Sequence, residues 1–284
     1  MVLYSDFATP TVSTSADTAG TTANLTYNGI GGRVHFAWLS GGVPTATAAQ
    51  GVKPYVIFTG TGVPGVQPNI PLGRWRSAYL ATASVGSVSA GPTAFPLSWN
   101  APANGQVTID VRNAAATAAP LVQVGMIYGS GSFTDWEYGN GDPWNLRAIP
   151  TTCITATPTS VTSTTETGIG TLTIPADYPN VVGLTTLGVT NGVRVTAEEF
   201  LGTARYTATG AGRGVQFEPA QKWPFFGQQD APVGTDIQDE SFSPSDSWHP
   251  LSFTGSLNST IQSLVTLRTA VTNATSFQIF AALK

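Results

Sequence analysis

The stretch Phe95-Pro96-Leu97-Ser98-Trp99 has a near copy about one half-chain later, His249-Pro250-Leu251-Ser252-Phe253. In each copy a Gln comes after the motif, an Arg lies six residues beyond that Gln, and an apolar segment follows an Ala/Thr-rich loop. These positions are Gln106, Arg112 and residues 121–128 in the first copy, and Gln262, Arg268 and residues 277–283 in the second. From the Gln onward the copies align without a gap. A repeat on this scale predicts two domains built on one plan, with the same two closing strands in each.

The repeat also predicts how the chain is divided. Residues 1–32 are expected to form an N-terminal arm or edge strand, and residues 33–150 a first β domain with a joining loop. Residues 151–284 are expected to form a second β domain that carries a long irregular insertion at 219–248.

Turn-forming residues and short apolar segments dominate the rest of the sequence, which contains 31 Gly and 20 Pro. The clearest helix signal is short: Thr196 is a candidate N-cap, and Glu199 follows three residues later. This pattern predicts an all-β protein of the sandwich class with one or two short helices.

Two segments indicate which side chains face a core. In Gln106 to Arg112 the alternation places Val107, Ile109 and Val111 inward and Thr108, Asp110 and Arg112 outward. In Arg33 to Leu39 the same rule places Val34, Phe36 and Trp38 on one face and His35 on the outward face.

Charged residues make up only 10% of the sequence, against roughly 25% in an average soluble protein. Such a surface suits a protein that is largely buried in an assembly, or an extracellular protein. The twelve Lys and Arg residues are scattered, which argues against direct nucleic-acid binding because phosphate neutralisation needs clustered cations. The beginning of the sequence lacks the pattern of a signal peptide, and we expect no transmembrane helix.

Few residues are suited to catalysis. His35 and His249 are the only histidines, and Cys153, the only cysteine, excludes an internal disulfide and is expected to be a small buried hydrophobe. The carboxylate pairs Asp135 with Glu137, Glu198 with Glu199, and Asp239 with Glu240 are better explained by solvated loops or helix capping than by glycoside hydrolysis. We therefore predict that the protein is not an enzyme and uses no cofactor.

Irregular segments hold the remaining candidate residues. Calcium could be bound by oxygens of the loop that contains Asp135, Glu137 and Asp142, although a solvated or interface loop is the simpler explanation. Aromatic side chains in loops favour contacts between proteins or with sugars. The residues predicted to make inter-subunit or surface loop contacts are Trp136, Tyr138, Trp144, Trp223, Phe225 and Phe226.

With its two β halves, its repeated Pro-Leu-Ser-aromatic motif and its long loops, the chain resembles the double jelly-roll major capsid proteins of icosahedral DNA viruses with an internal membrane. The resemblance is architectural and covers most of the chain, without a family motif that matches residue by residue. It implies two jelly-roll sandwiches side by side, and a homotrimer that forms a pseudo-hexameric capsomer. It also implies a location in the virion after synthesis in the host cytoplasm, with penton or minor capsid proteins and an underlying membrane as partners.

Other functions stay open at this point. One alternative is a single jelly-roll capsid protein with a decorating domain, and another is a carbohydrate-binding module or adhesin that uses the loop tryptophans. An enzyme is the third, and the sparse titratable residues argue against it.

Overall fold

A computed structural model describes most of the chain. The described residues are 2–29, 31–43, 54–71, 88–113, 121–130, 148–190, 201–211, 222–226, 253–267 and 275–284. Within these ranges the secondary structure is entirely β, and every strand pair is antiparallel. These ranges contain no helix that is long and apolar enough to cross a membrane.

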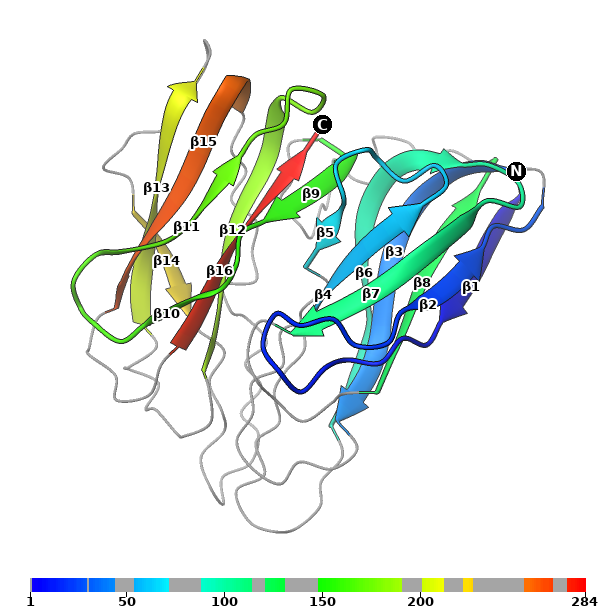
Figure 1. The fold of residues 1–284 in the computed structure, drawn as a ribbon, viewed down its shortest axis with the longest axis horizontal. Helices are drawn as coiled ribbons and strands as arrows, with labels where there is room; N and C mark the ends of the chain where they lie inside the picture. Colours follow the sequence, from blue (N-terminus) through cyan, green and yellow to red (C-terminus); the bar gives the residue numbers. More distant parts are fainter. Residues whose placement is uncertain are drawn as a thin grey trace.

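The first sandwich consists of two four-stranded sheets (Figure 1). One sheet has the order β1 (Leu3–Ala8), β8 (Leu121–Gly129), β3 (Gly32–Val43) and β6 (Val88–Ala101). The other has the order β2 (Ala23–Thr26), β7 (Gln106–Asn113), β4 (Pro54–Gly60) and β5 (Asn69–Ile70).

The second sandwich repeats this order with one change. Its first sheet contains β9 (Thr152–Thr155) and β10 (Thr159–Val161), both paired with β16 (Thr275–Leu283), followed by β12 (Asn180–Thr190) and the beginning of β15 (Phe253–Leu267). Its second sheet contains β11 (Thr167–Thr173), the remainder of β15, β13 (Leu201–Ala211) and β14 (Lys222–Phe226). Because β15 belongs to both sheets, hydrogen bonds join all eight strands.

Each strand of the first sandwich thus has a counterpart in the second. The strand β12 corresponds to β3, β13 to β4, and β16 to β8. The single strand β15 occupies the positions of both β6 and β7, because it pairs with β12 in one sheet and with β13 in the other. Two four-stranded layers of this order form a jelly roll. The prediction of an all-β double jelly roll is confirmed, and the exact domain limits given from the sequence stay a prediction.

The repeat that predicted this plan holds as far as β7 and β15. Gln106 and Gln262 lie on the outward faces of these strands, and Ile109 and Val265 point into their cores. In the closing strand the gapless alignment is shifted by one residue, so that aligned residues of β8 and β16 face opposite sides of their sheets. Leu121 of β8 is exposed, whereas Phe277 of β16, its partner in the alignment, is buried in a core.

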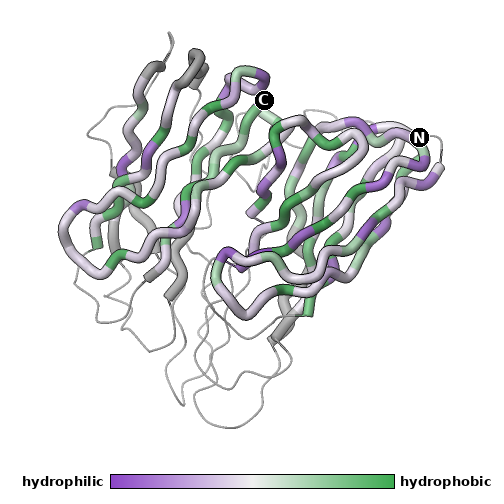
Figure 2. Tube along the Cα trace, in the orientation of Figure 1, coloured by the Kyte–Doolittle hydropathy of each residue, from purple (hydrophilic) through white to green (hydrophobic). Residues whose placement is uncertain are grey.

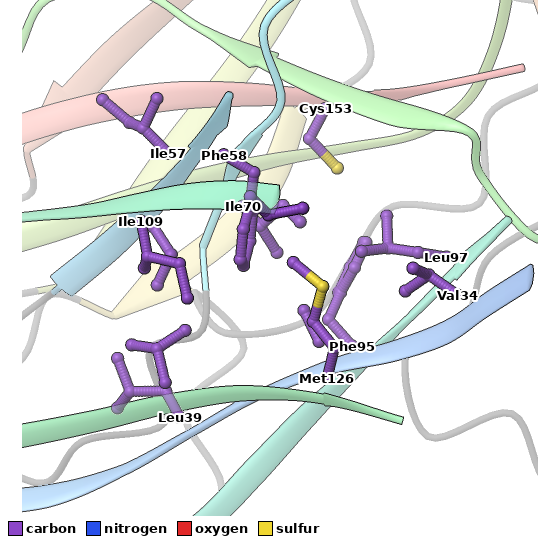
Figure 3. Packing of buried hydrophobic residues seen from close by; sticks show 14 of the residues in the cluster. Val34, Leu39, Ile57, Phe58, Ile70, Phe95, Leu97, Ile109, Met126 and Cys153 are labelled. Carbon is purple, nitrogen blue, oxygen red and sulfur yellow. The ribbon is translucent and has the colours of Figure 1, made fainter. Parts of the chain in front are cut away.

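Each sandwich has its own apolar core. The first contains a ring cluster in which Phe58 and Trp99 are 5.6 Å apart and Tyr27 and Tyr128 are 5.0 Å apart. Figure 3 shows Phe58, Phe95 and Met126 between the sheets, with Cys153 of the second sandwich reaching the same cluster. The second core is smaller and includes Ile169, Leu184, Val265, Phe277 and Ile279.

Strand β3 differs from its predicted alternation. The register shifts between Val34 and Phe36 in the pairing with both neighbouring strands, which is the effect of a β-bulge. Val34 therefore points inward and Phe36 and Trp38 outward, instead of sharing one face. His35 lies at the irregularity and is buried, so the expectation that it faces solvent is wrong.

A second difference concerns the insertion predicted at 219–248. Residues 222–226 are not irregular but form β14, which pairs along β13 with Trp223 opposite Ala204. The helix predicted from Thr196 lies outside the described residues.

Candidate functional site: the seam and two free sheet faces

The two sandwiches meet along a seam between β4 and β5 of the first and β9, β12 and β16 of the second. The rings of Tyr55 on β4 and Phe280 on β16 are 5.9 Å apart in a T-shaped arrangement. The backbone N–H of Ser98 donates to the carbonyl of Pro150 at 3.0 Å, and β5 lies beside β9 (Figure 1). The second-sandwich residues that join the first core cluster are Cys153, Val182, Phe280 and Ala282.

Burial at the seam explains the composition of β16. One face of this strand fills its own core with Phe277, Ile279 and Ala281, and the other face presents Phe280 and Ala282 to the first sandwich. A strand buried on both faces is nearly continuous in apolar residues instead of alternating. Figure 2 shows apolar residues along the strands in the middle of the molecule, between the two cores.

Two polar groups in this region have unusual surroundings. Gln278, on the seam face of β16, is 1% exposed, and within the described structure neither its Nε2 nor its Oε1 has a hydrogen-bond partner. Complete burial raises the pKa of the Cys153 thiol well above its ordinary value. Cys153 is therefore a neutral thiol and a poor nucleophile, in agreement with the sequence-based expectation of a small buried hydrophobe.

An ion cluster lies beside the seam on the outward face of β7. The Arg112 Nε donates to the Asp110 Oδ2 at 2.9 Å, and the Arg112 Nη1 lies 3.9 Å from the Asp17 Oδ1. The Tyr55 hydroxyl donates to the Asp17 Oδ1 as well, and the Asp17 N–H donates to the carbonyl of Asn113 at 2.8 Å. These contacts fasten the segment between β1 and β2 onto the sheet.

Burial raises the pKa of Asp17; Arg112 partly offsets this effect, and Asp110 adds to it. The sequence correctly placed Asp110 and Arg112 on the outward face of β7. It gave no indication of Asp17, because contacts between segments that are distant in the sequence have no local pattern. With both carboxylates facing one guanidinium, the cluster is built to hold a segment in place.

Among the described residues, no part of the second sandwich packs on the outer face of the first sheet, β1–β8–β3–β6, and this face is apolar. Phe7 is 54% exposed and Leu121 is 67% exposed. The rings of Phe7 and Trp38 are 6.1 Å apart, and the Trp38 ring lies over Gly125 of the strand between them, where an added Cβ would approach the ring to 2.3 Å. We call this surface the open apolar face; its outward apolar residues are Leu3, Phe7, Phe36, Trp38, Leu121 and Ile127.

The outer face of the sheet β11–β15–β13 in the second sandwich is likewise uncovered by the described parts of the first, and its chemistry is different. Arg205 on this face is paired with Glu166 through two hydrogen bonds of 3.0 and 2.5 Å, and this pairing raises the pKa of the guanidinium. We call this surface the threonine face; its outward threonines are Thr171, Thr173, Thr203, Thr207, Thr209, Thr260 and Thr266.

Most residues singled out from the sequence lie outside the described ranges. They include the calcium candidates Asp135, Glu137 and Asp142, the loop aromatics Trp136, Tyr138 and Trp144, and the histidine His249. Trp223, Phe225 and Phe226 belong to strand β14. Among the described residues, no three His, Cys, Asp or Glu residues are grouped so as to hold a metal ion.

The sequence reasoning missed both free faces. A usable signal was present in residues 3–8, where Leu3, Ser5 and Phe7 alternate with Tyr4, Asp6 and Ala8. Composition gave the other signal, because threonine is frequent throughout β11, β13 and β15.

No protein-family model matches this sequence, and no curated protein does either. Several solved structures are similar in fold. PNGase F, a glycosylasparaginase from Flavobacterium meningosepticum, is 12% identical with a TM-score of 0.39, over 99% of this chain and 95% of that one. The major capsid protein P2 of bacteriophage PM2 is 8% identical with a TM-score of 0.29, over 98% of each chain. A chain of Sulfolobus turreted icosahedral virus is 11% identical with a TM-score of 0.24, over 92% of this chain and 55% of that one.

These likenesses include viral capsid folds and also an enzyme. The prediction that the protein is not an enzyme is therefore contradicted, because the likeness to PNGase F has a higher TM-score than either viral likeness. The exclusion of catalysis is withdrawn. With every TM-score below 0.5, function has to be argued from the geometry of the chain itself.

Proposed function

We propose that the chain is a shell-forming subunit of an icosahedral virus, of the double jelly-roll major capsid class, and that three copies form a pseudo-hexameric capsomer. The observation that carries this proposal is the duplication of one strand order in two sandwiches that stand side by side in a single chain. Three such chains supply six similar sandwiches, which is the number that hexagonal packing requires.

The surface chemistry supports the same function. With 10% charged residues, the chain has little electrostatic repulsion to oppose close packing between copies. Exposed large apolar side chains on a sheet, such as Phe7 and Leu121, are typical of surfaces that contact another protein. Penton or minor capsid proteins, an underlying membrane and a location in the virion belong to the proposal as its expected context.

The experiment is to purify the full chain and determine its mass by analytical ultracentrifugation, then image it by electron microscopy. We expect trimers of pseudo-hexagonal outline, and sheets or shells at higher concentration. A stable monomer over the whole concentration range would overturn the proposal, and so would release of glycan from a glycopeptide by that monomer.

Two earlier interpretations stay predictions with tests of their own. Calcium binding by Asp135, Glu137 and Asp142 can be measured by isothermal titration with calcium chloride. The carbohydrate-binding alternative predicts sugar binding on a glycan array that is lost on Trp136→Ala or Trp223→Ala.

A further inference from the structure

We propose that the open apolar face of one copy docks on the threonine face of a second copy, so that the contact between chains repeats the seam within each chain. This inference rests on the proposed function in one respect: both need copies of the chain to associate. It goes further, because it names the two surfaces, their polarity and the direction of assembly.

The chain supplies its own template for this contact. At the seam, the outer face of the second sheet of one sandwich covers the outer face of the first sheet of the other. That arrangement uses one face of each kind and leaves one of each kind free. The free pair consists of the open apolar face, on the first sheet, and the threonine face, on the second sheet.

Phenylalanine side chains on the outer faces of the two corresponding sheets differ in their exposure to solvent. Phe280 on the covered face of the second sandwich is 1% exposed, whereas Phe7 on the corresponding sheet of the first is 54% exposed. A second sheet laid over Phe7 would remove it from water as Tyr55 removes Phe280. Burying a Phe side chain fully is favourable, and it is the main driving force available to this contact.

The open apolar face is shaped to receive a sheet. The Trp38 ring lies against Gly125, which has no side chain, and the planes of the Trp38 and Phe7 rings are inclined to each other by 49°. The rings of Phe7 and Trp38 thus lie on either side of Gly125 on β8, which has no side chain to project between them.

The threonine face can be buried at low cost. Arg205 on this face is already paired with Glu166, so covering the face does not leave this guanidinium without a partner. Threonine is β-branched and has few rotamers, so little side-chain entropy is lost when a partner covers it. The methyl groups can contact the aromatic rings while hydroxyls pair within the face, as the Oγ1 atoms of Thr209 and Thr260 do.

Direction follows from the two unlike surfaces. If apolar faces met each other, the product would be a two-fold dimer with both threonine faces left free. A head-to-tail contact uses one face of each kind per copy and can be repeated until a ring closes. Three chains linked in this way would give six sandwiches joined by six contacts of the same kind, three within chains and three between them.

Cross-linking distinguishes these arrangements. Ser5 on β1 and Thr171 on β11 are exposed and belong to the two faces, so Ser5→Cys and Thr171→Cys each place one reactive thiol on one face. Cys153 is buried and stays unreactive in the folded chain. With a short bis-maleimide, we expect linked dimers when the two variants are mixed and none with either variant alone.

Charge variants provide an independent readout. Phe7→Glu and Leu121→Glu each place a carboxylate on the open apolar face, and both residues are exposed enough for the fold to tolerate the change. We expect each to weaken self-association by at least about tenfold in sedimentation equilibrium. Ala103→Glu, an exposed position in the turn between β6 and β7 and outside the strands of both faces, is the matched control and should leave association unchanged.

The outcomes separate this inference from the proposed function. Trimers that neither cross-link in the mixture nor respond to Phe7→Glu and Leu121→Glu would overturn the docking surfaces and leave the capsid proposal standing. Linked dimers from Ser5→Cys alone would replace the head-to-tail contact by a two-fold one and overturn the inference. A chain that stays monomeric under all conditions would overturn both.

Discussion

The sheet β1–β8–β3–β6 and its counterpart, which is built from β9, β10, β16 and β12, share a strand order but differ in what lies on their outer faces. The counterpart is covered by the neighbouring sandwich, and its closing strand β16 is buried on both sides. The first sheet is open, and its closing strand β8 alternates between buried Val122 and Val124 and exposed Leu121 and Gln123. Equivalent strands thus acquire different sequences because they have different neighbours, and the cover on a sheet determines its composition more than the fold does.

The largest loss of stability is expected from a substitution in the covered sheet. Phe280→Ala removes a buried ring from the seam and its contact with Tyr55, and we expect a loss of about 3–5 kcal/mol in the free energy of unfolding. Phe7→Ala on the open sheet is the matched control and should cost less than about 1 kcal/mol in the monomer, because Phe7 is 54% exposed. Urea denaturation measures both, and equal losses would show that the seam is not a packed interface.

A smaller loss of stability is expected from a substitution in the open sheet. Gly125→Ala places a Cβ 2.3 Å from the Trp38 ring and 2.5 Å from the carbonyl oxygen of Asp6, so Trp38 or the strand must move. We expect a loss of about 1–3 kcal/mol in thermal or urea unfolding. Gly65→Ala, where the added Cβ meets no atom within 4 Å, is the control and should change stability by less than about 1 kcal/mol. A tolerated Gly125→Ala would show that Trp38 is free to leave the face.

A gain of stability is expected from Gln278→Met. The amide of Gln278 is buried at the seam without a hydrogen-bond partner in the described structure, and Met fills a similar volume without polar hydrogens or a carbonyl. Removing the unsatisfied amide should raise the free energy of unfolding by about 1–2 kcal/mol. Gln123→Met on the open sheet is the control, since Gln123 is exposed and its amide is solvated. A loss of stability on Gln278→Met would indicate that the amide has a polar partner.

The smallest effect depends on pH and concerns the ion cluster beside the seam. Burial raises the pKa of Asp17 in the folded chain above its ordinary value, so the folded state favours the protonated carboxyl. The contribution of this group to stability is therefore present below the ordinary carboxyl pKa, about 4, and is lost as pH rises through the raised pKa. Asp17→Asn cannot ionise, so its stability relative to the wild type should increase between pH 3 and pH 7, as measured by urea unfolding at each pH. A difference that does not change with pH would contradict the raised pKa.

The sequence predicted the elements that depend on local pattern. The alternation in β7 placed Val107, Ile109 and Val111 in the core, and the repeat predicted two sandwiches with matching final strands. The bulge at His35 could not be predicted, because a single extra residue in a strand has no recognisable sequence pattern. This bulge reverses the expected orientation of Phe36 and Trp38. The same limit explains the one-residue slip in the closing strand.

The seam and the free faces were harder to predict for a different reason. Whether an outward side chain such as Phe7 or Phe280 is exposed depends on which sheet covers it, and that depends on how the sandwiches stack. The nearly unbroken apolar run of β16 was the one local sign that a sheet lies between two cores. The Asp17 contacts join residues that lie 38 and 95 positions apart in the sequence, so no spacing rule applies to them.

The strand β15 has a consequence for how the molecule opens. In the first sandwich a turn at 102–105 separates β6 from β7, so the two sheets can lose their hydrogen bonds independently. In the second, β15 runs without interruption from its pairing with β12 to its pairing with β13. Amide hydrogen exchange should therefore report a single cooperative opening unit along β15 and two separate units along β6 and β7. We therefore expect the first sandwich, which has the turn, to open its two sheets more readily than the second.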